Sequence, residues 1–246
     1  MNGQQEKKKG IADIVFLMDA TGSMGNCIDK LKQSIMVFFR SMTEMDPATQ
    51  NFPAVKDWRA KVVGFRDAEA DGEHWFEDNA FTRDVAEIER QLGALKAEGG
   101  GDAPESLLDA IYKVTSAPKS AKGVEDPNAW RYQYDAARAI VVFTDAPFKP
   151  TMTVSGVAGG GIKDVRNVCV QNRFLLSVVA PKGLPGGECF EEFDAIRYGK
   201  WVDVPAGDPK DGSPIDAFMN NVQAVKDVVA KIAKTITQNS SEILGG

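Results

Sequence analysis

Two short apolar runs, each leading to an aspartate, constrain the fold of this chain more than any other feature. Residues 14–18 read Ile-Val-Phe-Leu-Met and are followed by Asp19, and residues 139–143 read Ala-Ile-Val-Val-Phe and lead to Asp145. Continuous apolar runs of this length, rich in β-branched residues, are typical of strands that are buried on both faces of a sheet. After the first run, apolar residues recur at helical spacing over residues 25–42. The chain is therefore expected to contain strand–helix units.

Segments of strand type and of helix type alternate along the whole chain. Strands are expected at residues 14–18, 59–65, 73–76, 139–145, 174–180 and 201–204, and helices at 25–42, from 82 onward, 103–115, 162–171, 188–196 and 215–236. This alternation predicts an α/β fold of three layers, a doubly wound and mostly parallel sheet with helices on both faces. One domain is expected over residues 11–237, between a flexible leader (1–10) and a flexible tail (238–246).

The end of the first predicted strand carries the strongest functional signal. Asp19, Thr21 and Ser23 place one carboxylate and two hydroxyls at alternate positions directly after the strand. In an open α/β sheet, ligands bind at the carboxyl ends of the strands. Oxygen donors without cysteine or histidine suit a hard divalent cation, Mg²⁺ first, with Mn²⁺ or Ca²⁺ as alternatives.

Two further acidic residues are expected at the same edge of the sheet. Asp102 lies in a glycine-rich turn before a predicted helix, and Asp145 ends a central strand. In a doubly wound sheet these loops meet near the point where the strand order reverses. A single Asp-x-Thr-x-Ser segment is more often structural, because an aspartate after a strand commonly caps the next helix. Three such segments in this order favour a metal site.

Taken together, these segments resemble the von Willebrand factor A (vWA) domain family, most closely its intracellular and alpha-kinase-linked modules. The resemblance includes the stretch 19–24 (Asp-Ala-Thr-Gly-Ser-Met), Phe65-Arg66-Asp67, the turn 99–105 and Asp145-Ala146-Pro147. It implies a six-stranded sheet with one short antiparallel edge strand. It also implies a metal ion-dependent adhesion site (MIDAS) in which Asp19, Thr21, Ser23 and Asp145 bind the metal.

The chain departs from the family pattern in the second loop. Adhesion-type members usually have a neutral threonine there, whereas this chain has Asp102, with Glu105 close by in sequence. An additional carboxylate would hold the cation more tightly and would weaken its attraction for a partner's carboxylate. Because Mg²⁺ needs only one or two direct carboxylates, the sequence leaves three roles open for Asp102: direct ligation, ligation through water, or a hydrogen bond to the turn.

Three functions are compatible with these residues. The first is a protein-binding module, a scaffold or adaptor whose Mg²⁺ accepts an acidic side chain from a partner. The second is a Mg²⁺-dependent phosphatase-like hydrolase with Asp19 as nucleophile, although Thr21 stands where such enzymes have their general acid. The third is a structural subunit without metal. The site residues favour binding over catalysis, so no enzyme activity is expected.

Composition narrows the classes of partner. The 246 residues include 29 Lys and Arg against 35 Asp and Glu, a formal net charge of −6. This charge argues against nucleic acid or anionic membrane as a partner. The sequence contains no apolar run long enough to span a membrane and no apolar signal core after its N-terminal lysines, so a cytoplasmic protein is expected.

Overall fold

The computed structural model describes residues 10–43, 55–101, 103–154, 159–206, 208, 210 and 213–243. Within these residues six strands form one sheet: β1 (Ile11–Asp19), β2 (Asp57–Phe65), β3 (Phe76–Glu77), β4 (Ala137–Phe143), β5 (Phe174–Lys182) and β6 (Gly199–Pro205). Their order is β3-β2-β1-β4-β5-β6, and only β3 pairs antiparallel to its neighbour. The predicted doubly wound sheet with a short antiparallel edge strand is confirmed.

The central strand β1 explains why the sheet has helices on both faces. Every residue of β1 after Ile11 is buried, so neither face of the strand meets water. Its side chains alternate between two hydrophobic clusters, with Phe16 on one face and Val15 and Leu17 on the other. Such a strand can exist only between two layers of helices.

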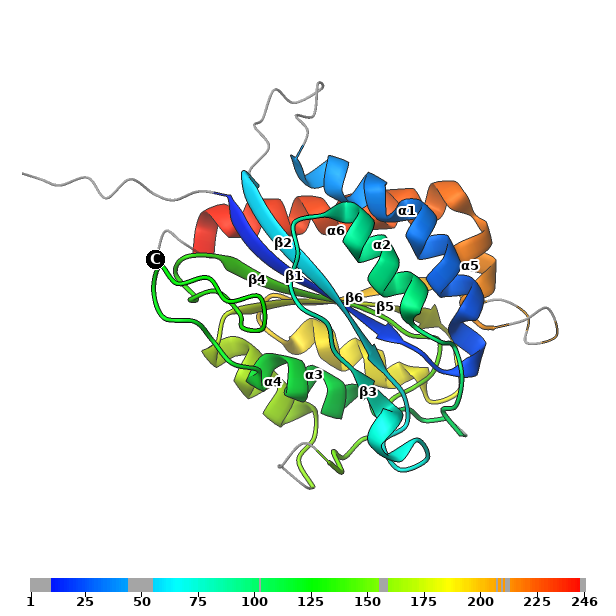
Figure 1. Cartoon of the computed structure of the whole chain (residues 1–246). Helices are drawn as coiled ribbons and strands as arrows, with labels where there is room; N and C mark the ends of the chain where they lie inside the picture. The colour runs from blue at the N-terminus through cyan, green and yellow to red at the C-terminus, as the bar shows by residue number, and fades with distance from the viewer. Residues whose placement is uncertain are drawn as a thin grey trace, which may run out of the picture.

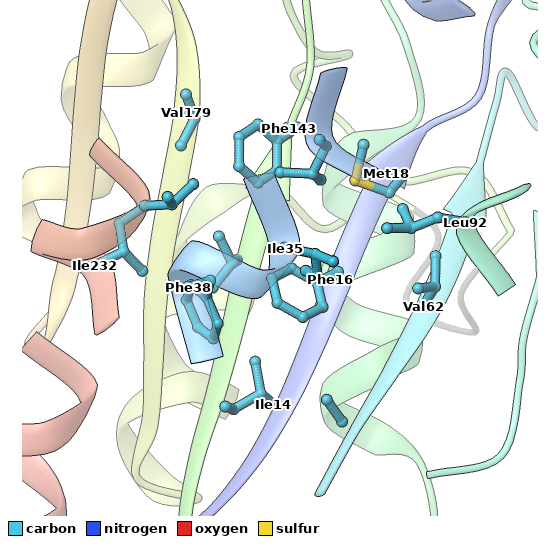
Figure 2. Close-up of a cluster of buried hydrophobic side chains, with 14 of the residues drawn as sticks. Ile14, Phe16, Met18, Ile35, Phe38, Val62, Leu92, Phe143, Val179 and Ile232 are labelled. Carbon is cyan, nitrogen blue, oxygen red and sulfur yellow. The ribbon is translucent and has the colours of Figure 1, made fainter. Parts of the chain in front are cut away.

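The two faces of the sheet are covered by different sets of helices. One face of the sheet is covered by α1 (Gly25–Thr43), α2 (Val85–Ala94), α5 (Asp216–Asn220) and α6 (Val222–Ile243), and the other by α3 (Leu107–Ser116), α4 (Ile162–Gln171) and the 3₁₀ segment η3 (Gly187–Ala195) (Figure 1). Figure 2 shows the core of the first face, where Phe16 of β1 meets Phe38 of α1. Their rings pack edge to face, with 5.1 Å between centroids.

None of the helices in the described part of the chain is long and apolar enough to cross a bilayer.

The strand order brings the ends of β1 and β4 together. The chain passes from β1 to β2 on one side, and β4 later pairs with the other side of β1. The two strands are in register up to Met18 and Phe143, so Asp19 and Thr144 follow at adjacent strand ends. The loops that leave β1 and β4 lead to helices on opposite faces, which opens a crevice between them.

The helix predicted at residues 103–115 begins later than expected, at Leu107. The reason lies in the backbone of Glu105, which pairs with a distant loop instead of entering the helix. The Glu105 N–H donates to the Pro147 carbonyl at 2.9 Å, and the Lys149 N–H donates to the Glu105 carbonyl at 2.9 Å. This pairing holds Glu105 in a loop at the carboxyl edge of the sheet.

The helix predicted from Thr82 also begins later, at Val85. The backbone of Thr82 pairs with Ala60 of β2, and Asp84 is the N-cap, accepting a hydrogen bond from the Ala86 N–H at 2.9 Å. Pairing with a strand fixes the Thr82 backbone in an extended conformation, so the cap moves to the next suitable side chain.

Three further boundaries differ from the prediction. The edge strand expected at 73–76 is shorter and later, because η2 (Gly72–Trp75) precedes β3. The helix expected at 188–196 is the 3₁₀ segment η3. The helix expected at 215–236 divides at Asn221 into α5 and α6, and α6 continues to Ile243, past the boundary expected at residue 237.

Candidate metal centre

The carboxylate of Asp19 is buried among neutral hydrogen-bond donors. Asp19 ends β1 and has no exposed surface. Its Oδ1 accepts from the Thr21 N–H at 3.0 Å and from the Thr21 hydroxyl at 2.7 Å, and its Oδ2 accepts from the Thr144 hydroxyl at 2.7 Å. Within the described residues no lysine or arginine forms an ion pair with Asp19. The carboxylate is oriented from three directions, but its charge is not neutralised.

The two hydroxyls of the first loop lie beside this carboxylate. The Thr21 Oγ1 is 3.3 Å from the Ser23 Oγ, and Ser23 is exposed at the surface. The glycine turn packs directly against Thr21: a Cβ added to Gly100 would lie 2.7 Å from the Thr21 Cβ, closer than real atoms approach. Gly100 also has a φ of +97°, which side chains rarely adopt. A glycine is therefore required where the second loop approaches the first.

Asp145 follows β4 and contributes an oxygen that has no partner. The residue is 4% exposed, and the Ser213 hydroxyl donates to its Oδ2. Its Oδ1 is buried without a hydrogen bond. A buried polar atom without a partner is costly and is uncommon in native proteins. A cation at this position would satisfy it.

Glu105 presents a second oxygen of this kind. The residue is 4% exposed, and its Oε2 is buried without a hydrogen bond. Both Glu105 and Asp145 line a cavity of about 730 Å³ at the carboxyl edge of the sheet. The other residues around this cavity come from the first loop, the glycine turn and three proline-bearing loops, and they include Thr21, Ser23, Gly99, Pro104, Pro147, Phe148, Leu184, Pro185 and Pro214. Its lining is thus largely apolar and includes the polar side chains of Thr21, Ser23, Glu105 and Asp145.

The electrostatics of this edge show an excess of negative charge. Burial, together with the charge of Asp145, raises the pKa of Asp19 to about 6. Burial also raises the pKa of Glu105 to about 9, with further contributions from the carboxylates of Asp19, Asp67, Asp71 and Asp145. Both shifts have the sign expected of carboxyl groups that lack a compensating cation.

The donor set therefore fits a hard divalent cation in its chemistry. Two carboxylates and two hydroxyls are oxygen donors, and Mg²⁺ commonly completes such a set with water. The described residues contain no ready-made group of three or more histidine, cysteine, aspartate or glutamate side chains placed to hold a metal. Any cation here must rely on hydroxyl or water oxygens beside the carboxylates.

Four of the five residues predicted from the sequence meet at this edge. Asp19, Thr21 and Ser23 are in direct contact or close to it, and Asp145 lies on the adjoining loop. The fifth, Asp102, lies outside the described residues. Sequence reasoning missed the hydroxyls of Thr144 and Ser213, which orient Asp19 and Asp145. Thr144 was detectable, since it precedes Asp145 at a strand end, but no local pattern links Ser213 to a residue 68 positions away.

Comparison with known proteins places the chain in a family. A model of the von Willebrand factor A domain matches residues 13–159, which is more than half of the chain. The chain belongs to this family. No curated protein sequence matches it.

The fold is also found in a solved structure. The crystal structure of the pilus adhesin SpaC from Lactobacillus rhamnosus GG superposes with a TM-score of 0.55 at 11% sequence identity. The match covers 94% of this chain and 31% of the adhesin chain, so this chain spans about a third of that protein. At this level of identity the likeness concerns the fold.

Proposed function

We propose that this chain is a Mg²⁺-dependent protein-binding module that acts as a scaffold or adaptor. The cation is held at the carboxyl edge of the sheet by Asp19, Thr21, Ser23 and Asp145, as in the MIDAS of its family. The observation that carries the proposal is the combination of a buried, unneutralised Asp19 with an unpaired buried oxygen on Asp145. An adhesive neighbour of the same fold supports a binding role.

The cation would supply one open coordination position that attracts an oxygen ligand. This chain's own residues do the rest. Thr21 and Thr144 hold the Asp19 carboxylate in one orientation, and Ser213 holds that of Asp145. The cavity beside them, about 730 Å³, is large enough to take side chains of a partner and is walled by prolines, which lose little entropy on binding. The partner presents an acidic side chain to the site and packs its neighbouring residues against these walls.

A calorimetric titration tests the metal part of the proposal. Purified protein is titrated with Mg²⁺ and with Mn²⁺, beside the isosteric variant Asp19→Asn. The wild type is expected to bind one cation saturably and the variant to show no measurable binding. The control is Asp29→Asn, which removes an exposed carboxylate from α1, outside the site, and should bind as the wild type does. Absence of binding in the wild type would contradict the proposal.

The protein-binding part is tested by capture. Immobilised wild type and Asp19→Asn are compared in Mg²⁺ and in EDTA. A partner that is retained by the wild type in Mg²⁺, and is lost both in EDTA and with the variant, supports the module. Equal retention under all three conditions would place the interface elsewhere.

The hydrolase alternative is tested with an aryl phosphate. Such a reaction requires an acid near Asp19 that protonates the leaving group, and the residue two positions on is Thr21, whose hydroxyl donates to Asp19 itself. No phosphate release above background is expected in Mg²⁺. Turnover that disappears in Asp19→Asn would favour the enzyme.

A further inference from the structure

Glu105 is a buried carboxyl group of this edge that has no role in the proposed function. It is 4% exposed, and its Oε2 is buried without a hydrogen-bond partner. In the part of the chain that the structure describes, no lysine or arginine forms an ion pair with it. A buried polar oxygen without a partner is costly, and ionising the group there without a cation would cost still more.

The cationic side chains nearby are bound to other groups. The Lys149 ammonium donates to the Asp67 carboxylate at 2.7 Å and also contacts Glu69. The guanidinium of Arg66 donates to backbone carbonyls and to the Glu77 carboxylate at 2.6 Å. Among the described residues Glu105 is therefore left without a cationic partner, while Asp67, which is also buried, has Lys149.

The backbone holds Glu105 toward the cavity and toward the first loop. Its N–H and carbonyl are both paired with the loop that follows β4, at Pro147 and Lys149. A Cβ built on Gly100 would lie 3.2 Å from the Glu105 Oε1 and 2.7 Å from the Thr21 Cβ. The Glu105 Oε1 and the Thr21 Cβ therefore both lie beside Gly100, and these two atoms are no farther apart than the sum of these distances.

We propose that Glu105 is an additional carboxylate ligand of the cation at this site, supplied by the second loop. The inference rests on the proposed function, because it requires a cation at Asp19 and Asp145. The carboxylates do not form a ready-made set of three in the described residues, so ligation would require the Glu105 side chain to turn toward the cation. The long side chain of glutamate allows this movement while its backbone stays paired.

The proposal has a consequence for the kind of partner. Three carboxylates around a dication leave a net negative charge, so the cation binds more tightly but attracts an incoming acid less strongly. The apolar walls of the cavity then contribute a larger share of partner binding. A partner with one acid flanked by apolar residues fits this chemistry better than a strongly acidic one.

The first test is the Mn²⁺ affinity of Glu105→Gln, measured by calorimetry on the full chain. The variant keeps the size and shape of the side chain and is expected to bind Mn²⁺ about tenfold or more weakly than the wild type. Its melting temperature in EDTA at neutral pH should stay close to that of the wild type, because burial raises the pKa of Glu105 to about 9 and the metal-free carboxyl is already neutral there. The matched control is Glu98→Gln, which removes an exposed charge from the neighbouring loop and should bind Mn²⁺ like the wild type.

The second test separates direct ligation from the effect of charge at a distance. Tb³⁺ luminescence lifetimes in H₂O and D₂O count the water molecules on a bound ion. Glu105→Gln is expected to gain about one water relative to the wild type, because water takes the place of the lost oxygen. Glu105→Asp, which keeps the charge on a shorter side chain, should bind Mn²⁺ with an affinity between those of the other two proteins.

Each outcome decides the question. Weaker binding with an added water supports ligation by Glu105. Wild-type affinity in Glu105→Gln, or weaker binding without an added water, overturns it, provided that Asp19→Asn has lost the metal. If the wild type itself binds neither Mn²⁺ nor Tb³⁺, the proposed function fails, and this result is distinct from a failure at Glu105 alone.

Discussion

The two ends of β1 each carry a fully buried aspartate, but the two carboxylates have different hydrogen-bond partners. Asp13, near the amino end, accepts hydrogen bonds from Arg59 at 2.8 Å through both oxygens, and from the Arg131 side chain and N–H at 2.7 Å. Asp19, at the carboxyl end, accepts hydrogen bonds from two threonines and from no other residue that the structure describes. The strand, the residue type and the burial are the same, but only one of the two charges is neutralised.

This difference separates a carboxylate with a structural role from the one at which the cation is proposed to bind. At the amino end two arginines supply the positive charge, and they also bind carbonyls of the 126–129 loop and of β1. At the carboxyl end the sequence supplies Asp19, Glu105 and Asp145 without an arginine or lysine bonded to any of them in the described residues. The fold tolerates this imbalance at the edge where α/β proteins bind ligands.

The largest expected effect comes from neutralising the two aspartates one at a time. Asp13→Asn removes the carboxylate that Arg59 and Arg131 share. Arg131 keeps Asp57 as a partner, but Arg59 is left with carbonyls, and the free energy of unfolding should fall by about 3–5 kcal/mol. Asp19→Asn removes an unneutralised charge and should change it by less than about 1 kcal/mol in EDTA. Urea unfolding followed by circular dichroism measures both. Equal losses would show that the two ends do not differ in the way described.

The pH dependence of stability in EDTA is the next effect. The raised pKa values, about 6 for Asp19 and about 9 for Glu105, mean that the folded protein keeps protons that the unfolded chain has released. Stability gained at low pH is therefore lost as the pH rises from about 5 to about 8, by up to roughly 1.4 kcal/mol per pH unit for each proton involved. Urea unfolding at three pH values in this range tests the sign.

Asp57, at the amino end of β2, does not offset this loss of stability between about pH 5 and 8. Burial opposes ionisation of Asp57, but hydrogen bonds from Arg83 and Arg131 outweigh it and hold its pKa below the ordinary value. Its contribution is present above the ordinary carboxyl pKa and is lost only at lower pH. A stability that rises between about pH 5 and 8 would contradict the assignment of unneutralised charge to the carboxyl edge.

The sequence predicted the sheet well because its signals are local. The apolar runs before Asp19 and Asp145 specify buried strands, and their aspartates fall at the ends where ligands bind. The position of Glu105 was not predictable, since its place in a loop depends on backbone pairing with Pro147, 42 residues away. The glycine-rich turn indicated a helix over residues 103–115, but it contained no information on that pairing, and the helix begins only at Leu107.

That the hydroxyls of Thr144 and Ser213 donate to Asp19 and Asp145 was not predictable, for the same physical reason. Thr144 lies one residue before Asp145, and its hydroxyl reaches Asp19 only because β1 and β4 are neighbours in the sheet. Ser213 contacts Asp145 through the loop before α5. Strand order and loop path are long-range properties, and a residue pattern alone does not encode them.

Added Mg²⁺ should partly compensate the charge of Asp19 at the carboxyl end of β1, as the arginines do for Asp13 at the amino end. A ligand that binds only the folded state at a hundred times its dissociation constant stabilises that state by about 2.7 kcal/mol. The wild type and Asp29→Asn should gain this stabilisation at neutral pH, whereas Asp19→Asn should gain none. Urea unfolding with and without Mg²⁺ measures the gain. An equal gain in Asp19→Asn would indicate that the cation binds at another place.

The smallest expected effect sharpens the comparison by altering only the orientation of Asp19. Thr144→Val keeps the shape of the side chain and removes the hydroxyl that donates to the Asp19 Oδ2 at 2.7 Å. Because such supporting bonds orient a ligand without touching the metal, the Mg²⁺ affinity should fall about tenfold, with a cost in stability of about 1 kcal/mol in EDTA. The matched control is Thr115→Val, which removes an equally buried hydroxyl that donates to the Ile111 carbonyl within α3. Calorimetry should show wild-type affinity for this control, and an equal fall in both variants would mean that the loss reflects general loosening of the fold and not the orientation of Asp19.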